Sequence, residues 1–155
     1  MNYIFDTNAV LIYLKDQEKK AWVDDQFEPL GDNNTAILSV VVLGELESII
    51  LRNRWGKKRK ESMEFFLRKF LITDINTRDI IKKYGEIDAF SQGKFLDNPL
   101  NDSSRNMGKN DLWIASTASI TKSSLISSDK DFIHLNGKYL DLILIELDGK
   151  KRKGL

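Results

Sequence analysis

Short runs of consecutive apolar residues alternate along this chain with longer stretches in which apolar residues recur every three or four positions. Such runs are typical of strands buried on both faces of a parallel sheet, and the periodic stretches are typical of helices. The pattern predicts strands at 3–5, 35–39, 71–75, 124–127 and 142–147. It predicts helices at 9–14, 19–28, 40–54, 58–70, 77–90 and 111–118, and a short turn or helix ending near 135. Their alternation favours an α/β fold with a central, mainly parallel sheet flanked by α-helices.

One stretch departs from this pattern. Residues 91–110 are rich in Gly, Asn, Ser and Asp and contain few apolar residues. We predict a loop here, and a loop of this length in a compact domain is often functional. It ends at Asn110, a good helix cap, which would put Asp111 in the first turn of the next helix.

Acidic residues stand where the predicted strands end. Asp6 directly follows the first strand, and Glu45 lies in the first two turns of the helix after the second. Asp111 opens the helix before the fourth strand, and Asp129 follows that strand. Because the carboxyl ends of parallel strands meet at one edge of a sheet, these four carboxylates are expected to converge there. Unpaired, they would repel one another and take up protons, so the cluster makes physical sense mainly as a divalent-cation site.

Each of these acids also has a plain structural interpretation. Asp6 fits a turn or a helix cap, a role that Thr7 or Asn8 could also fill. Asp111 fits a first-turn acid on the helix dipole. Glu45 fits a solvated helix face and Asp129 a turn. Their order and contexts, taken together, favour the metal site.

Composition narrows the chemistry further. The 155 residues, 41% of them hydrophobic, suffice for one domain with a proper core. The absence of cysteine excludes disulfides, thiolate zinc sites and cysteine nucleophiles, and a single histidine, His134, excludes a multi-histidine site. We expect His134 to be structural. A metal would need oxygen ligands, which points to Mg²⁺ or Mn²⁺. No signal peptide or membrane-length apolar run is visible, so we expect a cytoplasmic protein with no membrane contact.

Four motifs resemble the PIN domain family, and within it the VapC type of bacterial toxin ribonucleases. They are Asp6-Thr7-Asn8, Gly44-Glu45-Leu46, Asn110-Asp111-Leu112-Trp113-Ile114-Ala115 and Ser127-Ser128-Asp129-Lys130-Asp131-Phe132. They occur in the family's order and spacing over nearly the whole chain. The resemblance implies a PIN-like nuclease domain over 1–148, followed by a basic, disordered tail at 149–155.

The resemblance also implies an activity and roles for single residues. It implies a Mg²⁺- or Mn²⁺-dependent endoribonuclease, the toxin of a toxin–antitoxin pair, that forms a homodimer and binds a cognate antitoxin. Asp6, Glu45, Asp111 and Asp129 would bind the metal. Thr7 and Asn8 would orient Asp6, with Asn110 and Ser128 also near the site. Ser128 stands where the family more often has Thr, so Asp131 is an alternative to Asp129 as the fourth acid.

Charge is segregated along the chain, and this bears on the substrate. Residues 1–50 hold 3 basic and 9 acidic residues, a net of −6, whereas residues 51–70 hold 8 basic and 2 acidic residues, a net of +6. An acidic site would repel RNA unless a basic surface attracted it. We expect RNA contacts from Arg52, Arg54, Trp55, Lys57, Lys58, Arg59 and Lys60, with Trp55 exposed for stacking on a base, and from Arg105 and Lys109. The alternative is a solvated helix hairpin with Trp55 in the core.

Two rival functions remain. One is a non-catalytic RNA- or protein-binding module of the same fold, against which the presence of all four acids argues. The other is a phosphohydrolase of the haloacid dehalogenase kind. That chemistry needs a second Asp two positions after the first, where this chain has Asn8. We also expect Trp113 to belong to the core rather than to a stacking platform.

Overall fold

A five-stranded parallel sheet forms the centre of the computed structural model, which describes residues 1–147. Its strand order is β3-β2-β1-β4-β5. The strands are β1 (Asn2–Phe5), β2 (Thr35–Ser39), β3 (Leu71–Thr73), β4 (Ser124–Ser127) and β5 (Asp141–Leu144). The helices are α1 (Thr7–Lys15), α2 (Gln17–Phe27), α3 (Val40–Arg52), α4 (Lys57–Leu67), α5 (Arg78–Ser91), α6 (Lys109–Ile120) and the 3-10 helix η1 (Lys130–Leu135). The predicted α/β class and the five strands are confirmed.

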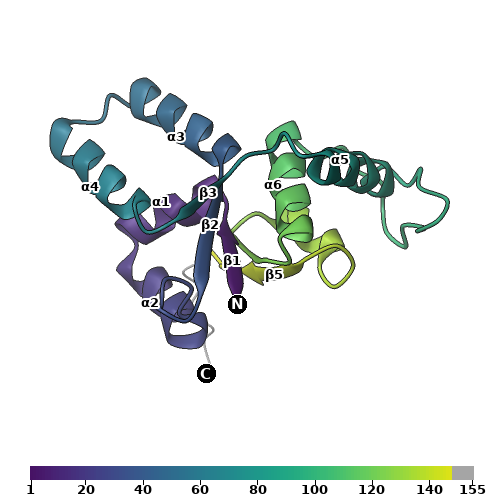
Figure 1. Cartoon of the computed structure of the whole chain (residues 1–155), viewed down its shortest axis with the longest axis horizontal. Helices are drawn as coiled ribbons and strands as arrows, with labels where there is room; N and C mark the ends of the chain where they lie inside the picture. The colour runs from purple at the N-terminus through teal and green to yellow at the C-terminus, as the bar shows by residue number, and fades with distance from the viewer. Residues whose placement is uncertain (148–155) are drawn as a thin grey trace.

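The helices extend the molecule in two directions from the sheet (Figure 1). The α3–α4 hairpin projects on one side, and α5 with the loop after it projects on the other. Within residues 1–147 no helix has the length and apolar character needed to cross a membrane. The basic tail predicted at 149–155 lies outside the described residues.

Two predicted strands are shorter than expected. At the sheet edge, β3 ends at Thr73, because the next side chain, that of Asp74, accepts a hydrogen bond from the Ile75 backbone at 2.7 Å and turns the chain. At the other edge, β5 ends at Leu144 rather than 147. The Ile145 amide still donates to the carbonyl of Ser127, the last residue of β4, at 2.8 Å, so the pairing of the two strands ends where β4 ends.

The register of the central strands fixes what lies side by side at their carboxyl ends. Ile4 pairs with Ile37 of β2 and with Leu125 of β4, and Phe5 pairs with Ile126. The residues that follow, including Asp6, therefore leave the sheet at one level. In parallel sheets this edge is where ligands bind.

Aromatic rings anchor β1 beneath this edge. Phe5 is fully buried and makes edge-to-face contacts with Tyr13 of α1, at 4.9 Å between ring centroids, and with Phe70, at 5.0 Å. Such contacts add to the free energy gained by burying the ring. They hold β1, α1 and the end of the α4 segment in one arrangement directly below Asp6.

We predict that Phe5→Ala lowers the free energy of unfolding by about 3–5 kcal/mol, because it removes a fully buried ring and leaves a cavity. Urea denaturation followed by circular dichroism measures this change. Phe65→Ala on α4 is the matched control, since Phe65 is 65% exposed, and it should change the same quantity by less than about 0.5 kcal/mol. Equal losses in the two variants would contradict this assignment of the core.

Candidate active site

Asp6 is a buried carboxylate held on both oxygens. It is the N-cap of α1, where Oδ1 accepts from the Ala9 amide at 2.8 Å, and Oδ2 accepts a short hydrogen bond from the Ser127 hydroxyl. Only 4% of the residue is exposed. The pKa of Asp6 is raised to about 7, mainly by burial and in smaller part by repulsion from Asp111 and Asp129, while the two hydrogen bonds act against this rise.

The residues expected to orient Asp6 do not do so. Thr7 donates its hydroxyl proton to Glu45 Oε1 at 3.0 Å, so it positions the acid from α3 instead. Asn8 is exposed and makes no side-chain hydrogen bond within residues 1–147. Ser127 and the first turn of α1 take this role, because the register of β1 and β4 brings the Ser127 hydroxyl against Asp6. The sequence offered only one signal for Ser127, its place at the end of a strand beside another strand that ends in an acid.

Three further carboxylates gather in front of Asp6. One oxygen each from Asp111, Asp129 and Asp131 lies within 4.8 Å of the others. The pKa of Asp111 is raised to about 6, mainly by burial and in addition by repulsion from Asp129, Glu45 and Asp131. Asp131, predicted only as an alternative to Asp129, thus lies in the same group as Asp129.

Local hydrogen bonds explain how η1 presents two acids together. Asp129 is the N-cap of η1 and accepts from the Asp131 amide at 2.8 Å, while its own amide donates to the Ser127 hydroxyl oxygen at 2.9 Å. Ser127 therefore links Asp6 to the start of η1. Ser128, which lies between Ser127 and Asp129 in the sequence, is half-buried and makes no side-chain hydrogen bond in the described part of the chain.

The prediction that Asn110 caps the helix carrying Asp111 is wrong. Helix α6 begins at Lys109 with Gly108 as N-cap, and no side chain makes the cap hydrogen bond. A Cβ at Gly108 would lie 3.4 Å from Asp111 Oδ2, so glycine leaves room for that carboxylate. Asp111 still lies in the first turn, as predicted. Asn110 is exposed and its amide is free of protein hydrogen bonds within residues 1–147.

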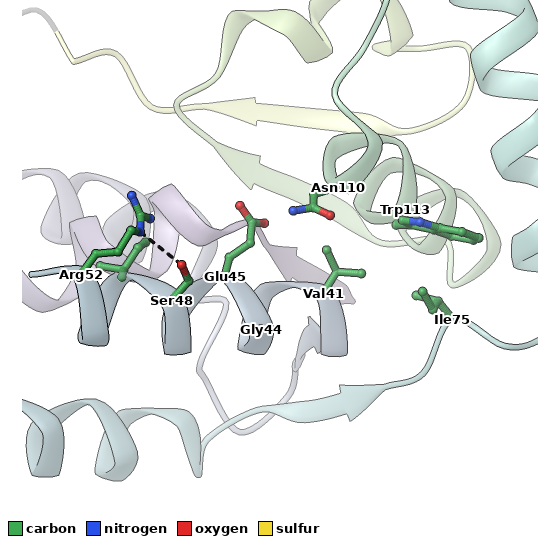
Figure 2. A pocket seen from close by; sticks show the side chains of 9 residues that line it. Val41, Gly44, Glu45, Ser48, Arg52, Ile75, Asn110 and Trp113 are labelled. Carbon is green, nitrogen blue, oxygen red and sulfur yellow. Dashed lines mark hydrogen bonds between the residues drawn. The ribbon is translucent and has the colours of Figure 1, made fainter.

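A cleft of about 560 Å³ opens beside the carboxylates, between α3 and the start of α6. Glu45 and Asn110 line it from opposite sides (Figure 2). Trp113 also lines it and is half-buried rather than part of the core as expected. Glu45 thus faces both the cleft and the acidic group, since its charge contributes to the raised pKa of Asp111.

The basic hairpin is exposed, but its tryptophan is not. Trp55 is only 7% exposed, and the Arg59 guanidinium lies 3.7 Å from the centre of its ring. The prediction that Trp55 is exposed for stacking on a base is therefore wrong. The α3–α4 turn packs its indole into the core, and Arg59 stacks on it. The six basic side chains predicted to contact RNA here are exposed: Arg52, Arg54, Lys57, Lys58, Arg59 and Lys60.

The predicted cation of the long loop, Arg105, pairs with an acid of the same loop. The guanidinium of Arg105 pairs with Asp102 at 3.2 Å, and its backbone amide donates to Ser91 at 2.8 Å. Lys109 is exposed at the start of α6. His134 is buried, lies 2.7 Å from the Ser91 hydroxyl and stacks on Phe90, which agrees with the expected structural role.

The donor set at the sheet edge fits a hard divalent cation. It consists of carboxylate oxygens, three of them from separate residues within 4.8 Å. The raised pKa values of Asp6 and Asp111 reflect first the free-energy cost of burying these carboxylates and then their mutual repulsion. A divalent cation removes this cost, and Mg²⁺ and Mn²⁺ prefer such oxygen ligands.

The fold and the site together define a class of protein. It is a parallel α/β domain with an acidic site, suited to a cation, at the carboxyl edge of its sheet. The chain belongs to the PIN domain family, whose model matches residues 3–138. The stretch matched includes every acid of the site.

Relatives and solved structures agree with this assignment. The chain is 27% identical over 133 residues to Ribonuclease VapC2 of Rickettsia felis, covering 85% of this chain and 90% of that protein. The fold resembles a chain of VapBC2 from Rickettsia felis, solved bound to a promoter DNA fragment, with a TM-score of 0.72 and 21% identity over 94% of this chain and 100% of that one. It also resembles VapBC-1 from nontypeable Haemophilus influenzae, with a TM-score of 0.70 and 20% identity over 93% and 98% of the two chains.

We predict a pH-dependent stability for the protein kept in EDTA. The pKa of Asp6 is about 7 in the folded state and has an ordinary value of 3.8 in the unfolded chain. The folded state therefore binds more protons between these values, and the free energy of unfolding should fall as pH rises from about 4 to 7. One such proton gives a slope approaching about 1.4 kcal/mol per pH unit.

The variant Asp6→Asn should remove the contribution of Asp6 to this slope and leave that of Asp111, whose pKa is about 6. The loss of slope should therefore be clearest between pH 6 and 7. The variant should also be more stable than the wild type above pH 7, because a neutral amide can keep both hydrogen bonds. Urea titrations at each pH measure it. Asp97→Asn is the control, since Asp97 is exposed far from the acidic group in the loop after α5, and it should reproduce the wild-type profile. A wild-type profile that is flat between pH 4 and 7 would refute the raised pKa.

Proposed function

We propose that this protein is a metal-dependent endoribonuclease that hydrolyses RNA phosphodiester bonds and serves as the toxin of a toxin–antitoxin pair. The convergence of carboxylates from α1, α3, α6 and η1 at one sheet edge carries most of the weight. Membership of the PIN domain family and the relationship to Ribonuclease VapC2 support the same activity.

Asp6, Glu45, Asp111, Asp129 and Asp131 are the residues that would hold the cation. Mg²⁺ or Mn²⁺ fits their oxygen donors. When bound, such an ion activates water as a nucleophile, polarises a phosphoryl oxygen and stabilises the departing oxyanion.

The chain's own residues prepare this site. Ser127 and the Ala9 amide fix both oxygens of Asp6, and Thr7 fixes one oxygen of Glu45. The carboxylates need little rearrangement to bind a cation, and this preorganisation preserves binding free energy. Burial of Asp6 also keeps bulk water from its oxygens.

The basic α3–α4 hairpin supplies attraction for the polyanion that the acidic site would repel. Of its exposed basic side chains, Arg52 lies on the same α3 that carries Glu45, and the four from Lys57 to Lys60 lie on α4. Phosphates of RNA bound along the hairpin would bring a neighbouring phosphodiester to the sheet edge. Contact with phosphates is independent of base identity, so the hairpin would give affinity rather than sequence preference.

We further propose two protein contacts, a cognate antitoxin and a second copy of this chain. Several solved structures of similar fold are VapBC complexes or other toxin–antitoxin complexes. Two large apolar side chains on the hairpin, Leu51 and Phe65, are 77% and 65% exposed, as a surface for a protein partner would require. The proposed activity, on cellular RNA, would be exerted in the cytoplasm.

The first test is cleavage of total cellular RNA by purified protein freed of any partner. We expect discrete fragments with Mg²⁺ or Mn²⁺ and none with EDTA. Asp111→Asn should lower the cleavage rate by about 100-fold or more, because it removes a carboxylate at the centre of the acidic group. Gel analysis of end-labelled RNA measures the rate.

A matched pair on one helix controls for general damage. Glu45→Gln should lose cleavage, whereas Glu47→Gln, two residues away and exposed, should keep it. Both variants should unfold at the wild-type temperature or above. Full activity of folded Asp111→Asn would refute the site, and a wild-type protein that binds RNA without cutting it with either metal would favour a non-catalytic binding module.

Salt dependence tests the basic hairpin. Lys58→Gln combined with Lys60→Gln should reduce the slope of log Kd against log salt by about 1.4, because each phosphate contact to a single strand contributes about 0.7. Fluorescence anisotropy with a labelled single-stranded RNA in EDTA measures it. Lys82→Gln, exposed on α5, should leave the slope unchanged, and an unchanged slope in the double variant would remove the hairpin from the RNA path.

A further inference from the structure

The cleft beside the carboxylates has a feature that phosphodiester hydrolysis alone does not require. Two stripes of side chains face each other across it (Figure 2). Glu45, Ser48 and Arg52 lie on one face of α3, and Asn110 and Trp113 lie on one face of α6. Spacings of three and four residues put them on common faces. The cleft therefore runs from a cation at one end, past Glu45 of the acidic site, to an aromatic ring at the other.

Trp113 is the aromatic end. It follows Asp111 by two residues, is half-buried and lines the cleft. The ring of Tyr84 from α5 packs against it, with 4.3 Å between centroids and 41° between planes. This contact braces the indole, so little conformational entropy is lost when a flat ligand stacks on it. The other two tryptophans differ, since Trp55 is covered by Arg59 and Trp22 lies on α2.

Asn110 lies between the indole and Glu45 in the cleft (Figure 2). Because Gly108 occupies the N-cap position, the Asn110 amide is not used to cap α6. It has no protein hydrogen bond within residues 1–147 and is exposed. A side-chain amide offers both a donor and an acceptor, which suits the edge of a nucleobase.

Arg52 closes the opposite end. Its Nε donates to the Ser48 hydroxyl at 3.1 Å, which leaves the terminal nitrogens of the guanidinium for a ligand (Figure 2). A guanidinium is well suited to bind phosphate with two hydrogen bonds. The cleft thus combines a phosphate-binding group, Glu45 of the acidic site, a polar amide and a flat ring, which together suit the phosphate and the base of a nucleotide.

From this arrangement we propose that the cleft is a nucleotide subsite, in which Trp113 stacks on an unpaired base next to the scissile phosphate. Asn110 contacts the edge of that base and Arg52 binds a neighbouring phosphate. The substrate class is therefore single-stranded RNA or a loop, because a base within a duplex cannot leave its stack to reach the indole without a cost in free energy. This inference rests on the proposed nuclease function.

Tryptophan fluorescence tests the subsite without cleavage. The full chain in EDTA is titrated with single-stranded octamers of A, C or U, and with a duplex of complementary octamers. We expect single strands to quench the fluorescence and the duplex to leave it nearly unchanged. Trp113→Leu, which keeps an apolar contact with Tyr84, should abolish the quenching and weaken binding about tenfold. Trp22→Phe should be quenched like the wild type.

Asn110→Ala provides a second variant that leaves folding undisturbed, because the side chain is exposed and unbonded. It should narrow the differences in affinity among the three single strands. The subsite would be overturned if the single strands quenched the fluorescence of Trp113→Leu as much as that of the wild type. It would also be overturned if this variant bound them with an affinity within twofold of the wild-type value.

The cleavage assay separates this inference from the function on which it rests. Cleavage of RNA by a protein whose fluorescence no octamer quenches would overturn the subsite alone and leave the cleft to a protein partner. Trp113-dependent quenching in a protein that cuts no RNA with either metal would support the subsite and overturn the nuclease.

Discussion

Burial of a carboxylate among other carboxylates at one sheet edge is the constraint on which the rest of the structure depends. Asp6 is buried beneath Asp111 and Asp129, and its pKa is raised to about 7. A chain that only had to fold would avoid such a group. The aromatic contacts below β1 and the hydrogen bonds from Ser127 and Ala9 keep it in place despite this cost. Stability given up at a site in this way is typical of residues retained for chemistry.

The fold was accessible from sequence because the apolar runs are short, separate and followed by strong helix signals. All five strands were predicted, and so was the convergence of acids after them. The strand ends at β3 and β5 were not, because they depend on a local Asp74 turn and on where the neighbouring strand stops. The first cause is a single side chain and the second is a tertiary contact. The periodicity of apolar residues detects neither.

Within the site, residue types were predicted better than partners. Asp6, Asp111 and Asp129 were named from their places at strand and helix ends, but the hydroxyl of Ser127 was not, because its partner lies 121 positions away along the chain. The tryptophans show the same limit. Trp55 among basic residues looked exposed and is buried, whereas Trp113 among apolar residues looked buried and lines the cleft. Burial depends on how helices pack, and α5 against α6 decides the second case.

The order of the strands has a consequence for synthesis of the protein. β1 is made first, but its neighbour on one side, β4, begins only at Ser124, and the last acids of the site follow at Asp129 and Asp131. A nascent chain therefore carries Asp6 and Glu45 without the residues that complete the cluster until Asp131 has been made. The ribosome that makes this protein, itself built of RNA, is exposed to no assembled site before Asp131 has been made, and products truncated before that residue lack the complete cluster.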